Sequence, residues 1–259
     1  MKGKIDTMAA ISRLLIALPT TSQSMKSSTA LTIANLVKLL QSHGIDAYLH
    51  NIDSAEIVTA RDMFANMVVY SDDLDGLIFI DSDMAFDPEI MMKMLRTGKD
   101  VVAAACTRRT LNLSTLLSAA QQHGNVPRAI AQASDFTVKL SWNDNDKAPV
   151  EVTDGFCRAA AVGMACAYIS KGALMAMVKA KAVEPRLDLS AGPGQTCWSF
   201  FAPVAPDGVR LGEDYSFCYR WTKTMRRELF VCVDEAIIHC GDYNYTARFI
   251  DLFEQTPAA

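Results

Sequence analysis

Two aspartates directly follow a run of large apolar residues. Residues 77–83 read Leu-Ile-Phe-Ile-Asp-Ser-Asp, and such a run predicts a strand buried on both faces, as in the middle of a parallel sheet. Ligands of open α/β sheets bind at the carboxyl ends of strands, and side chains two positions apart point the same way. We therefore expect Asp81 and Asp83 to converge on a divalent cation, Mg²⁺ or Mn²⁺, which would also bind phosphate oxygens.

Two adjacent acids and a histidine in the last fifth of the chain could join this chemistry. Glu213 and Asp214 stand at the predicted start of an amphipathic helix, where unpaired amides and the positive end of the helix dipole stabilise carboxylates. His239 follows a predicted strand, and beside two aspartates its imidazole is a candidate third metal ligand. Each group also has a simpler interpretation: a turn for the aspartates, helix capping for Glu213 and Asp214, and a structural role for His239.

The elements that must position these residues alternate along the first hundred positions. Strands joined to helices by short connections predict right-handed crossovers and a doubly wound, mostly parallel α/β sheet flanked by helices. Gly44 should lie just beyond the end of the first helix. The expected strands are 13–18, 46–51, 77–81, 100–105, 159–169 and 229–233, and the expected helices are 28–43, 55–70, 88–96, 171–181 and 213–224.

Two stretches break this alternation. Residues 107–150 predict an insertion that carries a short helix and a strand pair, and residues 184–198 predict a second irregular loop rich in Gly and Pro. We expect one domain over residues 1–259, with a nucleotide-binding half at about 10–105 and an acceptor or sugar half at about 106–259. Both loops are expected to shape the acceptor site or to close over the donor.

Composition excludes several classes of protein. Half of the 259 residues are hydrophobic and 21% are charged, as in an ordinary soluble enzyme, and the net charge of −4 gives no footprint for nucleic acid. Seven cysteines without a CxxC pair predict buried thiols in a reducing cytoplasm rather than disulfides or a zinc site. No stretch has the roughly 18 apolar residues of a membrane span, and the N-terminus does not resemble a signal peptide.

Taken in order, these motifs resemble the GT-A glycosyltransferases of the large family-2-like group. That family combines a D-x-D motif, a Gly-containing strand that faces the donor sugar, an E-D-x-x-F-x-x-R helix and a late histidine. The matching segments here are Asp-Ser-Asp at 81–83, Val-Gly-Met-Ala-Cys-Ala-Tyr-Ile at 162–169, Glu-Asp-Tyr-Ser-Phe-Cys-Tyr-Arg-Trp at 213–221 and His-Cys-Gly at 239–241. The resemblance spans about residues 13–242.

The resemblance implies a role for particular residues. The donor would be a nucleoside-diphosphate sugar, a UDP- or GDP-sugar, with Mn²⁺ or Mg²⁺ held by Asp81, Asp83 and His239. Asp81 would contact either the ribose or the metal. Asp62 stands where the family usually has Asn, which weakens the match around Arg61. The residues implied to line the donor site are Leu18, Pro19 and Thr20 at the base, Arg61 near the nucleotide-sugar, and Gly163 and Met164 at the sugar.

The resemblance also implies the chemistry. In inverting members the second acid of the pair, here Asp214, takes the proton from the acceptor hydroxyl, and Glu213 would orient it or the acceptor. In retaining members a similarly placed acid binds the sugar, and the sequence does not separate the two outcomes. Trp198 and Trp221 are candidates either for stacking on a sugar or for the core. The acceptor (a glycan, a lipid-linked sugar, a protein or another hydroxyl compound) and the oligomeric state stay open.

Three other functions remain as alternatives. A haloacid-dehalogenase-like phosphatase also places Asp-x-Asp after a buried strand, but normally after the first strand, with Gly-Thr following it. A nucleotidyltransferase would need a Gly-rich first loop with a basic residue, which is missing after Leu18. A non-catalytic nucleotide- or sugar-binding module is the third alternative, because a fold does not fix a function.

Overall fold

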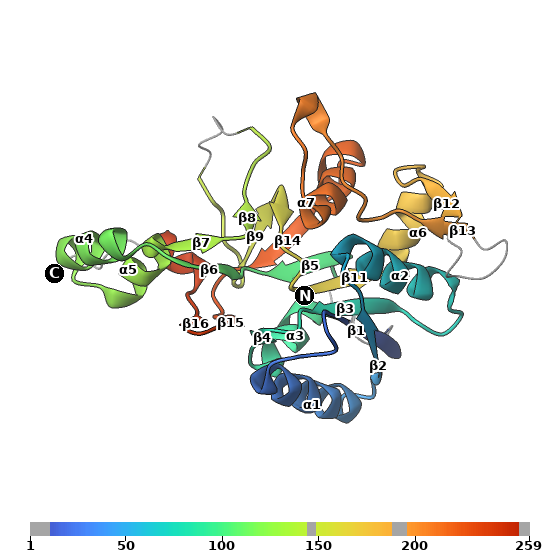
Figure 1. Cartoon of the computed structure of the whole chain (residues 1–259), viewed down its shortest axis with the longest axis horizontal. Coiled ribbons are helices and arrows are strands. Elements are labelled where there is room, and N and C mark those ends of the chain that lie inside the picture. The colour runs from blue at the N-terminus through green and yellow to red at the C-terminus, as the bar shows by residue number, and fades with distance from the viewer. Residues whose placement is uncertain (1–10, 144–148, 188–195, 254–259) are drawn as a thin grey trace, which may run out of the picture.

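The computed structural model describes residues 11–143, 149–187 and 196–253, and its centre is a seven-stranded sheet (Figure 1). The strand order is β2-β1-β3-β11-β5-β14-β9. The bounds of the strands are β1 Arg13–Thr20, β2 Asp46–Asp53, β3 Gly76–Ile80, β5 Val101–Ala104, β9 Phe156–Ala159, β11 Cys166–Ser170 and β14 Leu229–Cys232. The helices around it are α1 Ser27–Ser42, α2 Ile57–Tyr70, α3 Pro88–Leu95, α6 Lys171–Lys179 and α7 Glu213–Cys218.

Five of the seven strands run in one direction. β1 is parallel to β2 and β3, and β5 is parallel to β14. β11 is antiparallel to both β3 and β5, and β9 is antiparallel to β14. The expected architecture, an α/β domain with a mostly parallel central sheet flanked by helices, is confirmed.

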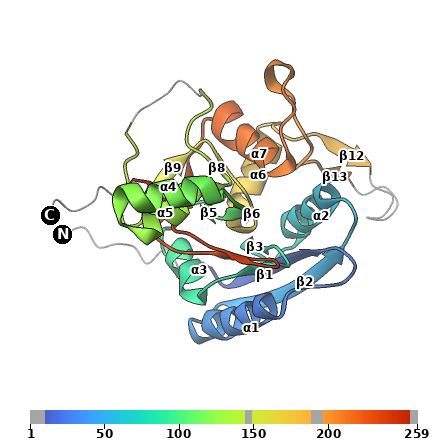
Figure 2. The ribbon, with the colours of Figure 1, turned by 60° about the vertical axis from the view of Figure 1, so that its left-hand side comes forward.

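Helices cover both faces of the sheet. Leu14 and Ile16 of β1 pack in one core with residues of α1 and α3, whereas Leu15 and Ala17 pack in the other core with residues of α2, α6 and α7. This alternation follows from the two-residue period of a strand. In Figure 1 and Figure 2, α1 and α3 lie on one side of the strands and α7 on the other. The sheet is therefore doubly wound, with helices packed on both of its faces.

Local signals agree with the observed ends of the helices. Gly44 has φ +74 just beyond α1, the left-handed conformation that glycine adopts most readily. Asp87 precedes α3 and its side chain accepts a hydrogen bond from the amide of Glu89 at 3.0 Å, with Pro88 in the first turn. The helix expected at 213–224 begins as α7 and continues as a π-helical segment, η4 Tyr219–Thr224.

The sequence prediction was wrong in detail for three segments. The insertion after β5 contains two helices instead of one, α4 Leu113–His123 and α5 Val126–Ala133, which project to one side of the sheet (Figure 1). The strand expected at 159–169 is interrupted at Gly163, between β10 Ala161–Val162 and β11. The second loop carries an antiparallel pair, β12 Pro185–Leu187 and β13 Thr196–Trp198; residues 144–148 and 188–195 of the two loops lie outside the described ranges.

The remaining strands are short. In the insertion, β6 Thr107–Leu111 pairs with β7 Ser134–Phe136, and β8 Val138–Lys139 pairs with β10. A separate three-stranded sheet joins β4 Met84–Ala85, β15 Ile238–Cys240 and β16 Asn244–Tyr245. β15 therefore lies directly beside the aspartate turn that follows β3.

The cysteine prediction is confirmed in its structural part. All seven thiols are free and buried, and burial raises the pKa of Cys157 to about 11. They act as small apolar side chains. Within the ranges that the structure describes, no helix is both long enough and apolar enough to cross a bilayer.

Candidate active site at the carboxyl ends of the strands

The predicted site residues gather at the edge of the sheet where the parallel strands end. Asp81 directly follows β3, and its amide donates to the carbonyl of Ala165 at 2.9 Å. Thr20 ends the neighbouring strand β1. Asp81 therefore lies at a strand end, as the sequence predicts, and such an edge is where open α/β sheets bind their ligands.

Arg61 links the first aspartate to the acidic pair. Its side chain, only 2% exposed, comes from α2, and Nη2 lies 3.1 Å from Oδ1 of Asp81. Nε lies 3.1 Å from Oδ1 of Asp214 at the start of α7. Burial alone would lower the pKa of Arg61, but the carboxylates of Asp214, Asp81 and Glu213 outweigh it and raise that pKa. A single guanidinium thus brings two sequence motifs into one site.

Asp214 is held in a position and a protonation range suitable for a base. Its Oδ2 accepts a hydrogen bond from the amide of Met164 at 2.9 Å. Its Oδ1 has no hydrogen bond within the described part of the chain, although Arg61 lies close enough for an ion pair. Burial raises the pKa of Asp214 to about 6, with Arg61 opposing and Glu213 adding to that rise. At pH 7 the carboxylate is therefore charged but can accept a proton readily.

Asp83 and His239 meet across the small sheet that contains β4 and β15. Nε2 of His239 lies 3.3 Å from Oδ2 of Asp83, and Nδ1 lies 2.8 Å from the carbonyl oxygen of Thr107. A carbonyl can only accept, so Nδ1 carries the proton. Burial lowers the pKa of His239, which favours the neutral ring with an unprotonated Nε2. In the neutral ring, Nε2 presents its lone pair toward Oδ2 of Asp83.

This pair suits a divalent cation, although the predicted set of three ligands is not assembled. Among the described residues, no three His, Cys, Asp or Glu side chains lie close enough together to hold an ion. A carboxylate and a neutral imidazole whose lone pairs converge supply two ligands, and Mg²⁺ commonly takes one or two carboxylates and completes its shell with water and phosphate oxygens. Metal binding by Asp83 and His239 stays a prediction, and Asp81 is engaged by Arg61 instead.

Arg109 was missed by the sequence analysis. It lies on β6, and its Nη2 contacts Oδ2 of Asp83. Its side chain is 47% exposed, in contrast to the buried Arg61. The signal in the sequence was a basic pair, Arg108 and Arg109, soon after the buried strand expected at 100–105. The strand-end rule applied to the aspartates points to this region of the chain, but not to Arg109 itself, which lies inside β6.

Pro19 and Thr20 lie at the end of β1, beside the end of β2. The hydroxyl of Thr20 donates to Asp53 at 3.3 Å and accepts from Asn51 at 2.9 Å. The loop that follows returns to the aspartate turn, where the amide of Lys26 donates to the carbonyl of Ser82 at 2.9 Å. The segment predicted to border the nucleotide base is therefore connected directly to residues 81–83.

Gly163 and Met164 occupy the break between β10 and β11. A Cβ on Gly163 would lie 2.7 Å from the hydroxyl of Thr137. The close neighbour that requires a glycine here is therefore another residue of the protein and not a ligand. The side chain of Met164 is fully buried in the core, and its backbone amide is the part that reaches Asp214. Their predicted place at the donor sugar is not tested by these contacts.

The two tryptophans differ in their surroundings. Trp221 is 2% exposed, and its indole donates to the carbonyl of Glu228 at 2.9 Å, so it belongs to the core. Trp198 is half-buried at the end of β13. Its backbone pairs with the side chain of Asn66 through hydrogen bonds of 2.8 and 2.9 Å. The second loop is thereby attached to α2.

Asp62, which departs from the family pattern, also binds this loop. It is fully buried, and its Oδ1 accepts a hydrogen bond from the amide of Phe201 at 2.8 Å. Burial raises its pKa to about 6, against the lowering effects of the Phe201 hydrogen bond and of Arg186 and Arg220. Asp62 is therefore a structural residue that fixes the loop next to the site, rather than a group facing a ligand.

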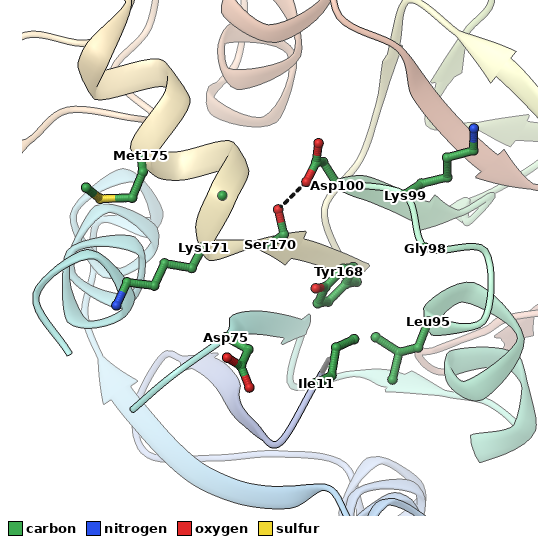
Figure 3. Close-up of a pocket in the computed structure, with 11 residues that line it drawn as sticks. Ile11, Asp75, Leu95, Gly98, Lys99, Asp100, Tyr168, Ser170, Lys171 and Met175 are labelled. Atoms are coloured by element: carbon green, nitrogen blue, oxygen red, sulfur yellow. Dashed lines mark hydrogen bonds between the residues drawn. The ribbon is translucent and has the colours of Figure 1, made fainter. Parts of the chain in front are cut away.

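A cavity of about 490 Å³ lies at the opposite edge of the sheet, between the starts of β3 and β5 and the end of β11 (Figure 3). Both of its acidic groups are already engaged, since Ser170 donates to Asp100 at 2.6 Å and Asp75 accepts from the amides of Ser12 and Arg13. The side chain of Lys171 points away, toward the carbonyl of Ser71. Because the predicted site residues lie elsewhere, we place the functional site at the other edge.

Comparisons with known proteins add little to this description. No protein family matches the sequence, and no curated protein does. The crystal structure of A197 from STIV is similar over 90% of this chain and 87% of that chain, at 16% identity and a TM-score of 0.46. The crystal structure of GalNAc-T7 with UDP, GalNAc and Mn²⁺ is similar over 86% of this chain but 42% of that chain, at 10% identity and a TM-score of 0.43. At these values neither likeness carries an argument about function.

Proposed function

We propose that this chain is a glycosyltransferase that moves a sugar from a nucleoside-diphosphate sugar to an acceptor hydroxyl. The observation that supports the proposal best is the buried Arg61, which joins Asp81 after β3 to Asp214 at the start of α7. The two acids belong to separate motifs of the suspected family, and the fold brings them to one edge of the sheet. Capping and turn formation alone would not require a shared buried arginine, whose desolvation is costly.

The donor would lie over the ends of β1 and β3. Its base would contact Pro19 and Thr20, and its diphosphate would approach Asp83 and His239 together with Mn²⁺ or Mg²⁺. When bound, the cation would act as a Lewis acid and stabilise the negative charge that develops on the departing nucleoside diphosphate. Arg61 would orient Asp81 through their 3.1 Å ion pair, whose arginine side is almost entirely shielded from water.

Asp214 would act as the base. Its Oδ1, which is paired with Arg61 but accepts no hydrogen bond, would accept the proton of the acceptor hydroxyl as that oxygen attacks the anomeric carbon, and the bond from this carbon to the diphosphate oxygen would break. The Met164 amide holds the other carboxylate oxygen, so the direction of Oδ1 is fixed. Glu213, next to it and half-buried, would orient the acceptor. This arrangement corresponds to inversion of the anomeric centre.

A product assay tests the proposal. The protein is incubated with UDP- and GDP-sugars, Mn²⁺ and a panel of hydroxyl acceptors, and the phosphorus-containing product is identified. Release of UDP or GDP supports a glycosyltransferase, whereas inorganic phosphate indicates a phosphatase and pyrophosphate a nucleotidyltransferase. If UDP or GDP binds in calorimetry but no product forms with any acceptor, the non-catalytic binding module is favoured.

A further inference from the structure

Arg109 has a place in the site that the proposed chemistry does not yet use. Its strand, β6, leaves the central sheet after β5 and begins at Thr107, whose carbonyl accepts from His239. The guanidinium of Arg109 contacts the Oδ2 atom of Asp83 that also faces His239. Arg109 therefore contacts Asp83, one of the two residues that suit a cation; the other is His239.

The aliphatic part of the Arg109 side chain lies close to Gly241, two positions after His239. A Cβ on Gly241 would lie 3.4 Å from Cδ of Arg109. The side chain as a whole is 47% exposed. The side chain thus lies close to Gly241 at Cδ, while nearly half of its surface borders solvent. This differs from Arg108, which is 59% exposed and pairs with Asp135 at 3.4 Å.

The charges around the site require a cation for any diphosphate. Asp81, Asp83, Glu213 and Asp214 contribute four carboxylates, and Arg61 and Arg109 contribute two guanidinium groups. A diphosphate would add further negative charge to this excess. Arg61 is buried between two carboxylates and cannot turn outward without leaving both unpaired. Arg109 holds only one carboxylate and borders solvent, so it is the arginine that can change partner.

We propose that Arg109 binds the diphosphate of the donor, an inference that rests on the proposed glycosyltransferase function. Without a nucleotide it neutralises Asp83. When the diphosphate arrives with its divalent cation, the guanidinium turns to the phosphate oxygens and leaves Asp83 and His239 to the cation. The planar fork of an arginine suits two phosphate oxygens at once, which a lysine does not.

This role predicts opposite effects of one substitution on two ligands. Arg109→Ala should bind Mn²⁺ alone more tightly than the unmodified protein, because the competitor for Asp83 is gone. The same variant should bind UDP or GDP in the presence of Mn²⁺ about ten- to hundredfold more weakly, because charge-assisted hydrogen bonds to phosphate are lost. The affinity of Arg109→Lys for UDP or GDP with Mn²⁺ should lie between that of Arg109→Ala and that of the unmodified protein.

Isothermal titration with MnCl₂ alone, and with UDP and GDP at saturating Mn²⁺, measures both effects. Arg108→Ala, on the same strand and away from Asp83, is the matched control and should change neither affinity. Thermal melting of each variant establishes that it is folded, and Arg109→Lys replaces the alanine variant if the latter melts early.

The outcomes separate this inference from the proposed function. Nucleotide affinity of Arg109→Ala within twofold of the unmodified protein overturns the inference and leaves the glycosyltransferase proposal standing. Weaker binding of both Mn²⁺ and nucleotide also overturns it, because Arg109 would then only hold Asp83 in place. If the unmodified protein itself binds neither UDP nor GDP with Mn²⁺, the proposed function fails and the role of Arg109 fails with it.

Discussion

The Nε of Arg61 lies 3.1 Å from Oδ1 of Asp214, inside the domain and at the edge of its central sheet. Arg61 comes from α2 in the first half of the chain and Asp214 from the start of α7 in the second half. Their contact makes the two halves of the domain share one charge network, to which Asp81 also belongs. The predictions below test this network and the groups around it.

Removing the buried guanidinium should destabilise the fold strongly. Arg61→Met keeps most of the side-chain volume but leaves Asp81 and Asp214 without their partner, which should lower the free energy of unfolding by about 3 kcal/mol or more. Arg13→Met is a matched control, since Arg13 also pairs with two carboxylates, at 2.8 and 3.3 Å, but is 43% exposed. Its loss should cost about 1 kcal/mol or less. If urea unfolding showed that Arg61→Met and Arg13→Met lose the same free energy of unfolding, the buried network would be contradicted.

Asp214→Asn should abolish transfer while nucleotide binding persists. An asparagine can still accept the hydrogen bond from Met164, so the local structure should be retained, but the amide cannot take a proton from the acceptor. We expect a fall in kcat of at least about a hundredfold, with the affinity for UDP or GDP in calorimetry little changed. Asp135→Asn, an exposed aspartate paired with Arg108, serves as the control. Full turnover by Asp214→Asn would exclude the base role.

The rate of transfer should rise with pH as Asp214 loses its proton. Because burial raises the pKa of this carboxyl to about 6, the base form predominates above that pH and is depleted below it. We expect kcat/KM to fall about tenfold for each pH unit below 6 and to level off above it. A profile that is flat from pH 5 to 7 would speak against Asp214 as the group that takes the proton.

Asp83→Ala should remove the dependence of nucleotide binding on the divalent cation. Asp83 contacts both His239 and Arg109, so its loss takes away one of the two groups that suit the cation. UDP or GDP should then bind equally weakly with Mn²⁺ and with EDTA, whereas the unmodified protein should bind much more tightly with Mn²⁺. Asp46→Ala, on the exposed surface of β2, should keep the Mn²⁺ dependence. Undiminished Mn²⁺ dependence in Asp83→Ala would refute the metal role.

Asp62 should make the stability of the fold depend on pH. Its pKa is about 6 in the folded protein, against an ordinary value of 3.8. Since the folded-state pKa is the higher one, the contribution to stability is present below about pH 4 and is lost as the pH rises through about 6. The unfolding free energy of the unmodified protein relative to Asp62→Asn should therefore fall by up to about 3 kcal/mol between pH 4 and 7. A constant difference across this range would contradict the raised pKa.

The sequence by itself determined the elements and the edge at which the chemistry would lie. Long apolar runs such as residues 77–80, helix ends such as Gly44 and the alternation of strands with helices are local signals, and most of these elements appear within a few residues of their predicted bounds. The placement of Asp81 at a strand end follows from the same signals, because the carboxyl ends of parallel strands share an edge.

Only the tertiary structure decided which charged groups meet. The pairing of Arg61 with both Asp81 and Asp214, and of Arg109 with Asp83, depends on how α2, α7 and β6 cross the end of the sheet. It depends also on the break between β10 and the antiparallel strand β11, which places the amide of Met164 next to Asp214. These contacts join residues far apart in the sequence, and local propensity contains no information about such distances. Helix and strand periods specify which face a side chain takes, whereas the neighbours it finds there are set by the packing of the whole domain.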